Sequence, residues 1–166
     1  MRTEPNPSET DRQAEPIGLA DSTRPGESAG RDEPAGQDEP LSPYRYEYLY
    51  PDEFLAQVSR MPVFLVPLGL LEWHGDHLPL GTDALKAHGL CLRIADRLRG
   101  GIVLPALPIG RPGYSRRVGT LTFAEATVAA MLEDLLGQLR KVGARVVLVL
   151  SGHYGDCQMD LVRRVT

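Results

Sequence analysis

Residues 63–83 read VFLVPLGLLEWHGDHLPLGTD, and this stretch decides the fold. Its first part, Val63–Leu68, is a short and nearly continuous apolar run bounded by Pro62 and Gly69, which is typical of a parallel strand buried on both faces. Its second part gathers two histidines and three carboxylates within 12 residues. The stretch therefore predicts a buried strand that leads directly into a loop rich in possible metal ligands.

Helical and strand-like patterns alternate along the rest of the chain. After a short extended entry over 44–50, they predict helices over 51–60, 83–99 and 122–142 and from 156 onward, and strands over 63–68, 102–109 and 146–150. The helix starts are predicted at polar caps, which are Asp83, Thr122 with Glu125 three residues later, and Asp156. Strands that alternate with helices are joined by right-handed crossovers, so we expect an α/β fold: a three-layer α/β/α sandwich with a mostly parallel sheet.

The first 43 residues differ in composition from the rest. They hold 7 of the 14 prolines and no aromatic residue, and their 4 Lys+Arg against 10 Asp+Glu give a net charge of −6. Such a segment cannot bury enough apolar surface to offset the entropy lost on folding. We therefore expect residues 1–43 to be a disordered, acidic, proline-rich tail, with a docking role toward a basic partner as the alternative, and residues 44–166 to form the folded domain.

Composition excludes several classes of protein. The net charge of −4 over 166 residues lacks a basic footprint for nucleic acid, so no nucleic-acid partner is expected. The longest apolar stretch, residues 61–71, is far shorter than the ~20 residues of a membrane helix. The polar, acidic N-terminal stretch is unlike a secretory signal, and two cysteines are too few for a disulfide framework. We therefore expect a cytoplasmic protein with reduced thiols and no membrane contact.

A second polar cluster follows a second strand. The run S-G-H-Y-G over residues 151–155 comes directly after the apolar run 146–150 and contains His153. In a parallel sheet this cluster and the loop after residue 68 meet at the same edge, where such folds bind ligands. Imidazole and carboxylate ligands suit zinc, manganese or iron, and a carboxylate can bridge two ions. The alternative is that these side chains only cap helices or bond to backbone.

Three segments resemble motifs of the creatininase (creatinine amidohydrolase) family. The run E-x-H-G-x-H-L-P-L-G-T-D over residues 72–83 resembles its long first motif, and residues 151–155 resemble its second. The Gly-Thr pair at 119–120 resembles a pair that precedes a capped helix in that family. The resemblance covers about residues 47–166, which is all of the chain except the acidic tail.

The resemblance implies an α/β/α sandwich with two divalent metal ions, which would be zinc, manganese or iron. Glu72 and His153 would bind one ion, His74 would bind the other, and Asp83 would bridge them. A water between the ions would attack a carbonyl carbon and break a C–N amide bond, because metal ions lower the pKa of bound water toward neutrality. The implied function is that of a metal-dependent amidohydrolase acting on a small or cyclic amide.

Other residues near the motifs have predicted roles outside the metal ligands. His77 would orient a ligand such as Asp83 or, less simply, take part in catalysis. Tyr154 and Arg116 are candidate substrate contacts, and His88 is predicted to be structural or on the surface. Arg116 belongs to a basic loop that would bind an anionic substrate group, line a subunit contact or remain solvated. The arginines of this loop are Arg111, Arg116 and Arg117.

The chain departs from the family in two places. Creatininase proper carries a glutamate ligand two residues after the histidine of its second motif, where this chain has Gly155. The family's late motif, with a further acidic ligand and a catalytic histidine and glutamate, is not found before Thr166, so we expect an N-terminal portion of the family fold. The alternative function is a degenerate or truncated, non-catalytic member that keeps the fold and partial metal binding. A homo-oligomer is expected for the full-length family by resemblance only.

Overall fold

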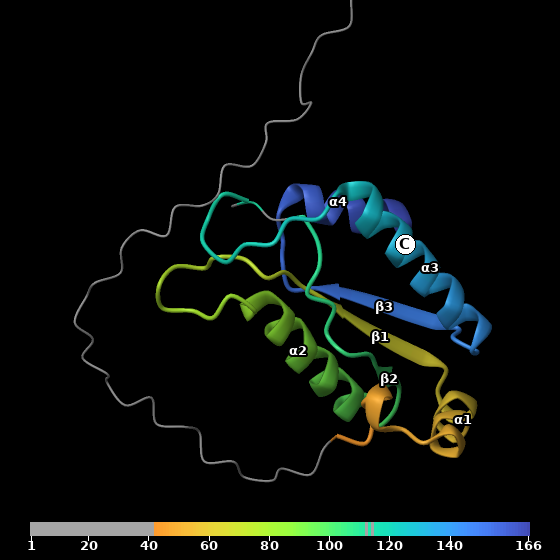
Figure 1. The fold of residues 1–166 in the computed structure, drawn as a ribbon. Coiled ribbons are helices and arrows are strands. Elements are labelled where there is room, and N and C mark those ends of the chain that lie inside the picture. Colours follow the sequence, from red (N-terminus) through yellow and green to blue (C-terminus); the bar gives the residue numbers. More distant parts are fainter. Residues whose placement is uncertain (1–41, 112, 114) are drawn as a thin grey trace, which may run out of the picture. The chain divides into compact units, whose positions relative to one another are not determined.

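The computed structural model describes residues 42–111, 113 and 115–166. The predicted tail falls, up to residue 41, outside these described residues, so its disorder stays a prediction. The predicted order of helices and strands is confirmed, and a short 3-10 turn, η1, replaces the extended entry expected over 44–50 (Figure 1). The elements are η1 Tyr46–Tyr48, α1 Pro51–Arg60, β1 Val63–Leu68, α2 Thr82–Leu98, β2 Ile102–Val103, α3 Glu125–Lys141, β3 Val146–Ser151 and α4 Asp156–Val165.

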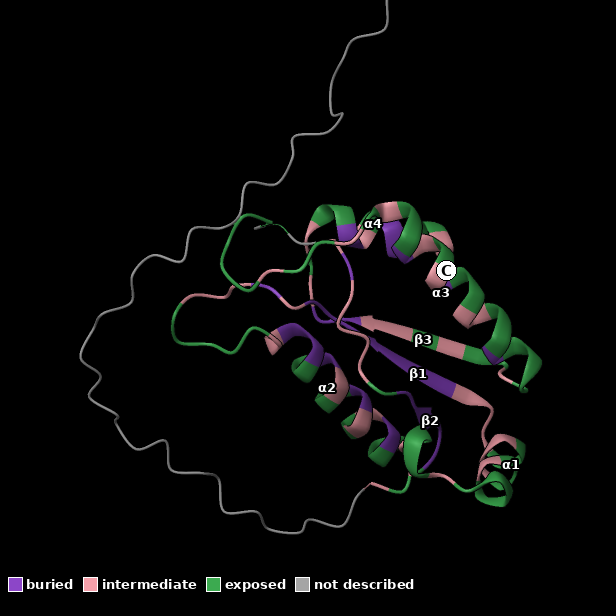
Figure 2. Cartoon of the chain, in the orientation of Figure 1, coloured by how far each residue is buried: buried purple, intermediate pink, exposed green. Residues whose placement is uncertain are grey.

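The three strands form one parallel sheet in the order β2-β1-β3. Phe64 pairs with Ile102 on one side of β1, and Val63 through Leu68 pair with Val146 through Ser151 on the other. Because β1 is central, its apolar run is buried almost throughout, as the sequence pattern predicts (Figure 2). Both strands that precede the polar clusters, β1 and β3, therefore end side by side.

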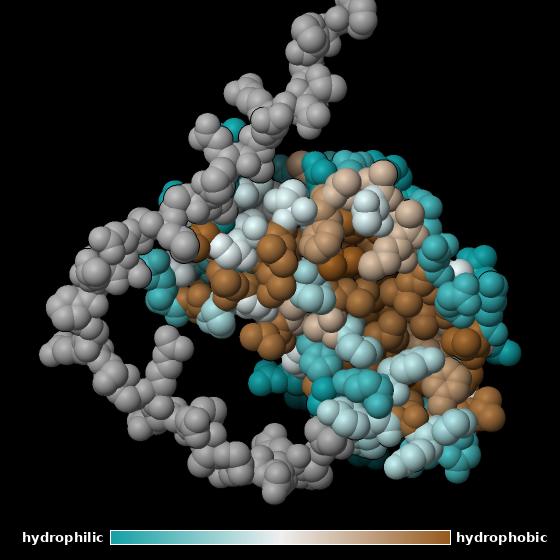
Figure 3. Space-filling view, viewed as in Figure 1, coloured by the Kyte–Doolittle hydropathy of each residue, from teal (hydrophilic) through white to brown (hydrophobic). Residues whose placement is uncertain are grey.

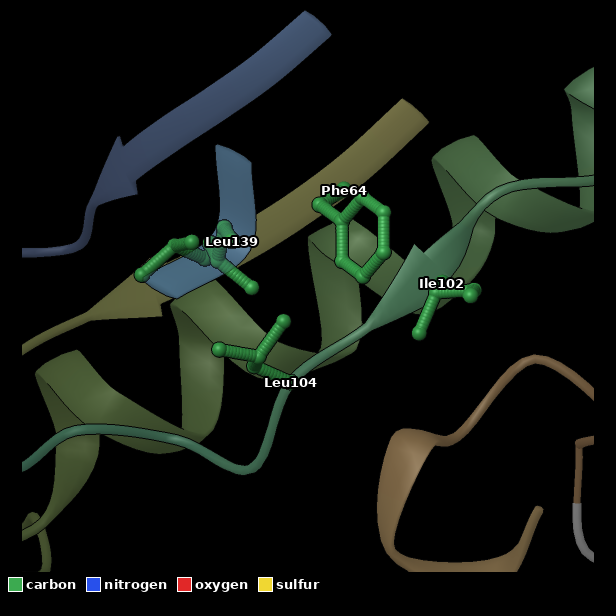
Figure 4. Close-up of a cluster of buried hydrophobic side chains, with 5 residues drawn as sticks. Phe64, Ile102, Leu104 and Leu139 are labelled. Atoms are coloured by element: carbon green, nitrogen blue, oxygen red, sulfur yellow. The ribbon is translucent and has the colours of Figure 1, made fainter. Parts of the chain in front are cut away.

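Helices cover the two faces of the sheet, which confirms the α/β/α arrangement (Figure 1). On one face, Phe64 packs with Leu139 of α3 and with Ile102 and Leu104 (Figure 4). On the other face, Leu65 packs with buried residues of α2. Successive residues of β1 thus face opposite layers, which is the period-two alternation of a strand.

The second strand is shorter than expected. Regular pairing was predicted over 102–109, but β2 covers only Ile102–Val103, with an isolated bridge between Leu107 and Leu68. Pro105 and Pro108 have no backbone N–H to donate to the neighbouring strand, so a continuous ladder cannot form through them. The segment nevertheless follows β1, because Leu107 N–H donates to the Pro67 carbonyl at 2.9 Å.

Three predicted helix caps are wrong. Thr122 does not begin a helix, since α3 starts at Glu125 with Ala124 at its N-cap and no side-chain cap. Asp83 and Asp156 lie inside the first turns of α2 and α4, whose N-caps are glycines. An acidic side chain in a first turn is still favoured by the helix dipole. For Asp83 the consequence is that its carboxylate is left for other contacts.

The outer edge of β3 and part of the domain surface remain apolar. Among the described residues no strand pairs with that edge, and Val146 and Leu148 are 54% and 42% exposed. Figure 3 shows hydrophobic side chains gathered over the middle of the viewed face, with hydrophilic ones around it. Within the described part of the chain, every helix is too short or too polar to cross a bilayer.

Candidate metal centre

The polar clusters meet at the carboxyl edge of the sheet. The chain leaves β1 at Leu68 and β3 at Ser151, which are paired residues, and α2 begins at the same edge (Figure 1). Glu72 and His74 lie in the loop after β1, and His153 lies just after β3. Asp83, in the first turn of α2, completes the group. The fold therefore brings together residues that are up to 81 positions apart in sequence.

Two glycines allow the first turn of α2 to approach the strand ends. A Cβ at Gly69 would lie 2.3 Å from the backbone nitrogen of Ala84, and a Cβ at Gly152 would lie 2.0 Å from the carbonyl oxygen of Asp83. Real Cβ atoms essentially never come within 3.0 Å of another heavy atom, so each position requires glycine. This close approach buries Asp83, which is only 2% exposed.

Each of the four predicted ligands has a side-chain atom within 4 Å of another of them. His153 Nδ1 is 2.8 Å from Glu72 Oε1 and 3.2 Å from Asp83 Oδ2. His74 Nε2 is 3.2 Å from Asp83 Oδ1 and 3.9 Å from Glu72 Oε1. The two oxygens of Asp83 thus face different histidines. Ligand atoms of Glu72, Asp83 and His153 all lie within 4.8 Å of one another, as in a possible metal site.

One contact orients the imidazole of His74, and another holds the backbone at His153. His74 Nδ1 lies 3.0 Å from the carbonyl oxygen of Glu72. Because a carbonyl only accepts, this contact places the hydrogen of a neutral imidazole on Nδ1 and directs the Nε2 lone pair toward Asp83. Ser151 Oγ donates to the carbonyl oxygen of His153 at 2.6 Å and so holds the backbone that carries the second imidazole.

The donor set fits a cation. Glu72 and Asp83 are two buried carboxylates, and burying carboxylates is costly unless cations compensate them. Lys86 Nζ lies 3.5 Å from Asp83 Oδ1, but its side chain is 46% exposed and it is a single charge. Three buried atoms of the group form no hydrogen bond with any described residue, namely Glu72 Oε2, Asp83 Oδ2 and His153 Nε2.

The spacing of these atoms also fits ligands around an ion. Ligands at 2.0–2.1 Å from a tetrahedral zinc lie about 3.3 Å from one another. The separations of 2.8 and 3.2 Å around His153, and of 3.2 Å between His74 and Asp83, are close to this value. Imidazole and carboxylate atoms of the group therefore stand at ligand-like distances, and Glu72 Oε2 is a buried acceptor with no hydrogen-bond partner among the described residues.

The other predicted site residues lie around this group. His77 is exposed in the loop, and no hydrogen bond or ion pair joins it to the four ligands within the described part of the chain, so its orienting role stays a prediction. Tyr154 is 66% exposed, with Lys86 Nζ 5.8 Å from its ring centroid. Arg116 is exposed in the basic loop. His88 is half-buried on α2, where burial and the nearby Arg45 lower its pKa.

Sequence patterns alone did not reveal several supporting residues. Ser151 is buried at the end of β3, and its contact with a carbonyl two residues later leaves no spacing signal. Thr120, whose Oγ1 accepts from the Trp73 N–H at 3.0 Å, is 47 residues away in sequence. The Gly-Thr pair had drawn attention to Thr120, but only the fold shows that it supports the ligand loop.

Comparisons with known proteins match the fold and these motifs. The family model of creatininase, described as creatinine amidohydrolase, matches residues 47–166. Creatinine amidohydrolase of Pseudomonas putida is 33% identical over 98 residues, covering 55% of this chain and 37% of that protein. The mycofactocin precursor peptide peptidase of Mycolicibacterium smegmatis is 30% identical over 106 residues, covering 60% of this chain and 42% of that protein.

Solved creatininase structures are also similar. A crystal structure of creatinine amidohydrolase, a manganese creatininase and a variant creatininase of Zn-Zn type match with TM-scores of 0.66, 0.65 and 0.64. Each is 28% identical, and each match covers 72% of this chain and 48% of the other. The chain therefore matches about half, or less, of the length of these relatives.

Proposed function

This chain belongs to the creatininase family, and from that membership and the site geometry we propose that it acts as a metal-dependent amidohydrolase. The proposed reaction is hydrolysis of a C–N amide bond in a small or cyclic amide. One observation carries the proposal: two buried carboxylates and two histidines from three separate segments meet at the carboxyl edge of a parallel sheet. This is the edge at which such folds bind ligands.

Each proposed ligand has a place in a two-ion site. Glu72 and His153 would hold one ion, as their 2.8 Å separation supports. His74 would hold the other, since it lies nearer to Asp83, at 3.2 Å, than to Glu72, at 3.9 Å. Asp83 would bridge the two, because each of its oxygens faces a different imidazole. We propose two divalent ions, zinc, manganese or iron; similar creatininases are described with manganese and with zinc.

The chain's own residues would prepare this site for an amide. When bound, divalent ions polarise a carbonyl and lower the pKa of a water toward neutrality. The Glu72 carbonyl holds His74 with Nε2 toward Asp83, so the imidazole needs no rearrangement to act as a ligand. Tyr154, which is exposed next to His153 in the chain, would contact a substrate from the solvent side. His77 keeps its proposed role of orienting a ligand such as Asp83.

The relatives support the class of bond rather than one substrate. The Pseudomonas putida relative is named for creatinine and the mycobacterial one for a precursor peptide. Both names describe cleavage of a carbon–nitrogen bond of an amide type. We therefore propose an amide substrate for this chain and leave its ring or peptide character to experiment. We also propose a cytoplasmic location and, as for the family at full length, a homo-oligomer.

A second candidate is a non-catalytic member that keeps the fold and partial metal binding. The observation that favours it is Gly155, which stands where creatininase proper carries a glutamate ligand. A Cβ at this position would lie 2.4 Å from His153 Nε2, so the described conformation has no room for a side chain there. The proposed site thus has one carboxylate fewer, and its second ion should bind more weakly.

Metal analysis tests the ligand assignment. Purified wild type, Asp83→Ala and the matched control Asp76→Ala, which removes an exposed acid of the same loop, are loaded with zinc or manganese and desalted. Elemental analysis by mass spectrometry should find most metal lost from Asp83→Ala and retained in Asp76→Ala, because Asp83, unlike the exposed Asp76, faces both imidazoles. Full retention of metal in Asp83→Ala refutes the assignment.

Hydrolysis assays separate the two candidate functions. The loaded wild type is incubated with a panel of lactams, linear amides and peptides, and product release is followed with and without a chelator. Chelator-sensitive hydrolysis that is absent in Asp83→Ala supports the amidohydrolase. Metal binding without hydrolysis of any panel member supports the non-catalytic candidate.

A further inference from the structure

One arginine of the basic loop lies over an aromatic ring in the loop that carries two of the proposed metal ligands. Arg117 Cζ lies 4.8 Å from the ring centroid of Trp73, a distance at which the guanidinium is attracted to the indole face. Trp73 stands between two proposed ligands, Glu72 and His74, in the chain. The stacking therefore sets a positive charge beside the loop that carries half of the ligand set.

Backbone contacts hold the two segments together. The Trp73 N–H donates to Thr120 Oγ1 at 3.0 Å, and the Leu121 N–H donates to the Leu71 carbonyl at 2.9 Å. The Thr120 N–H in turn donates to the Arg117 carbonyl at 3.2 Å, which closes a turn over 117–120. Arg117 is thus carried by a turn bonded to the ligand loop.

One glycine lets this turn pack closely against the ligand loop. Gly119 has a φ of +73°, in the left-handed region that favours glycine. A Cβ at this position would lie 2.4 Å from Leu80 Cδ1, in the same loop as the ligands. The turn that carries Arg117 therefore packs closely against Leu80 of the ligand loop.

The positive charge of Arg117 lies over the indole ring of Trp73. Three of the described arginines, namely Arg45, Arg163 and Arg164, pair with carboxylates instead. Within the described part of the chain, no carboxylate lies within ion-pair distance of Arg117. An arginine stacked by its face keeps its N–H edge available, and the N–H groups of a guanidinium match the two oxygens of a carboxylate.

We propose that Arg117 binds a carboxylate group of the substrate while the amide to be cleaved lies at the metal centre. The inference rests on the proposed function and narrows its substrate to amides that carry a nearby carboxylate, as in an acylated amino acid or a peptide C-terminus. Arg116, one of the two candidate substrate contacts predicted from sequence, forms no ring contact or ion pair with a described residue. The structure therefore assigns this role to its neighbour, Arg117.

The only tryptophan of the chain provides the assay. Because Trp73 is the single Trp in the sequence, its fluorescence reports on this position alone. The zinc-loaded full chain is titrated with N-acetylglycine and with its neutral counterpart N-acetylglycinamide. The acid should change the emission saturably and bind about tenfold or more tightly than the amide, because only the acid can form a charge-assisted pair with Arg117.

Three variants locate the contact. Arg117→Gln should abolish the preference for the acid. Arg117→Lys should keep part of the preference, because lysine has the charge but not the planar guanidinium. Arg116→Gln should keep the full preference. Metal content is measured for every variant, and unchanged zinc in Arg117→Gln separates lost carboxylate binding from a lost metal site. A tripeptide with a free C-terminus and its C-terminal amide are titrated in parallel, so that either source of the carboxylate is detected.

The outcomes distinguish this inference from the proposed function. Equal binding of acid and amide by the wild type, or an unchanged preference in Arg117→Gln, overturns the carboxylate site even if Asp83 proves to be a metal ligand. Loss of the preference in Arg116→Gln alone overturns it in favour of the neighbouring arginine. If Asp83→Ala retains its metal but the acid preference depends on Arg117, the ligand assignment fails and the carboxylate site stands.

Discussion

Adding one methyl group at Gly152 should both destabilise the domain and disturb the metal centre. In Gly152→Ala the new Cβ would lie 2.0 Å from the carbonyl oxygen of Asp83, whereas ordinary contact begins at 3.4 Å. Relief requires a displacement of about 1.4 Å between the end of β3 and the first turn of α2. Because the obstructing carbonyl oxygen belongs to the backbone, no side-chain rotation can relieve the overlap.

The expected magnitude follows from this overlap. Overpacking of a well-packed interior costs about 1–3 kcal/mol, and a collision with backbone belongs at the upper end of that range. For a domain of this size, about 2–3 kcal/mol corresponds to a fall in melting temperature of about 10 °C. The displacement also exceeds the ~0.2 Å tolerance of metal–ligand distances, so metal binding should weaken as well.

Gly89→Ala is the matched control. Gly89 lies on the exposed side of α2, and nothing lies within 4 Å of a Cβ added there. Alanine is favoured over glycine inside a helix by about 1 kcal/mol, so this variant should melt a few degrees higher than the wild type and keep its metal. The two variants make the same chemical change and are expected to shift stability in opposite directions.

Circular dichroism at 222 nm, recorded during heating of chelator-treated protein, measures both shifts without a contribution from bound metal. Elemental analysis of protein that has not met a chelator measures metal content. The reasoning is refuted if Gly152→Ala melts within about 2 °C of the wild type and retains its metal, because the strand end and α2 would then not be in the close contact described.

Three further predictions concern other parts of the domain. Burial raises the pKa of the Cys91 thiol to about 11. At pH 8 a thiol reagent should therefore modify the exposed Cys157 rapidly and Cys91 only on unfolding. Rapid modification of both thiols contradicts this prediction. Since the raised pKa belongs to the folded state, Cys91 contributes stability that is fully present below pH 9.0 and is lost as the pH rises toward about 11. Leu148 is 42% exposed on β3, whose outer edge pairs with no described strand. Leu148→Lys should therefore reduce self-association of the chain, measured by sedimentation velocity. An unchanged distribution of masses excludes that edge as the contact.

Much of the fold could be predicted because its signals are local. The apolar run Val63–Leu68 is a strand that is buried at adjacent positions, and the Val/Leu run over 146–150 pairs with it although Val146 and Leu148 stay exposed. The helices carry apolar stripes with a period near 3.6. The prediction failed where local patterns compete. Thr122 and Glu125 have the spacing of a capping box, yet α3 begins at Glu125 with Ala124 at its N-cap and no side-chain cap.

The candidate site also has a part that the sequence could predict and a part that it could not. The residue types and their positions after two strands predict a convergence of Glu72, His74, Asp83 and His153, because parallel strands end at one edge. The sequence could not indicate that Arg117, rather than Arg116, stacks on Trp73, since the two arginines are adjacent and the ring is more than 40 residues away. Such a contact depends on the path of the whole loop.

By itself, the sequence determined the order of elements, the parallel sheet and the chemistry available at its carboxyl edge, because these follow from periodicity and residue type. Only the tertiary structure decided which imidazole faces which oxygen of Asp83, and that Gly69 and Gly152 bring α2 close enough for this to happen. The physical reason is that distances between side chains on separate segments depend on how closely the backbones pack, and steric contacts at single atoms set that packing.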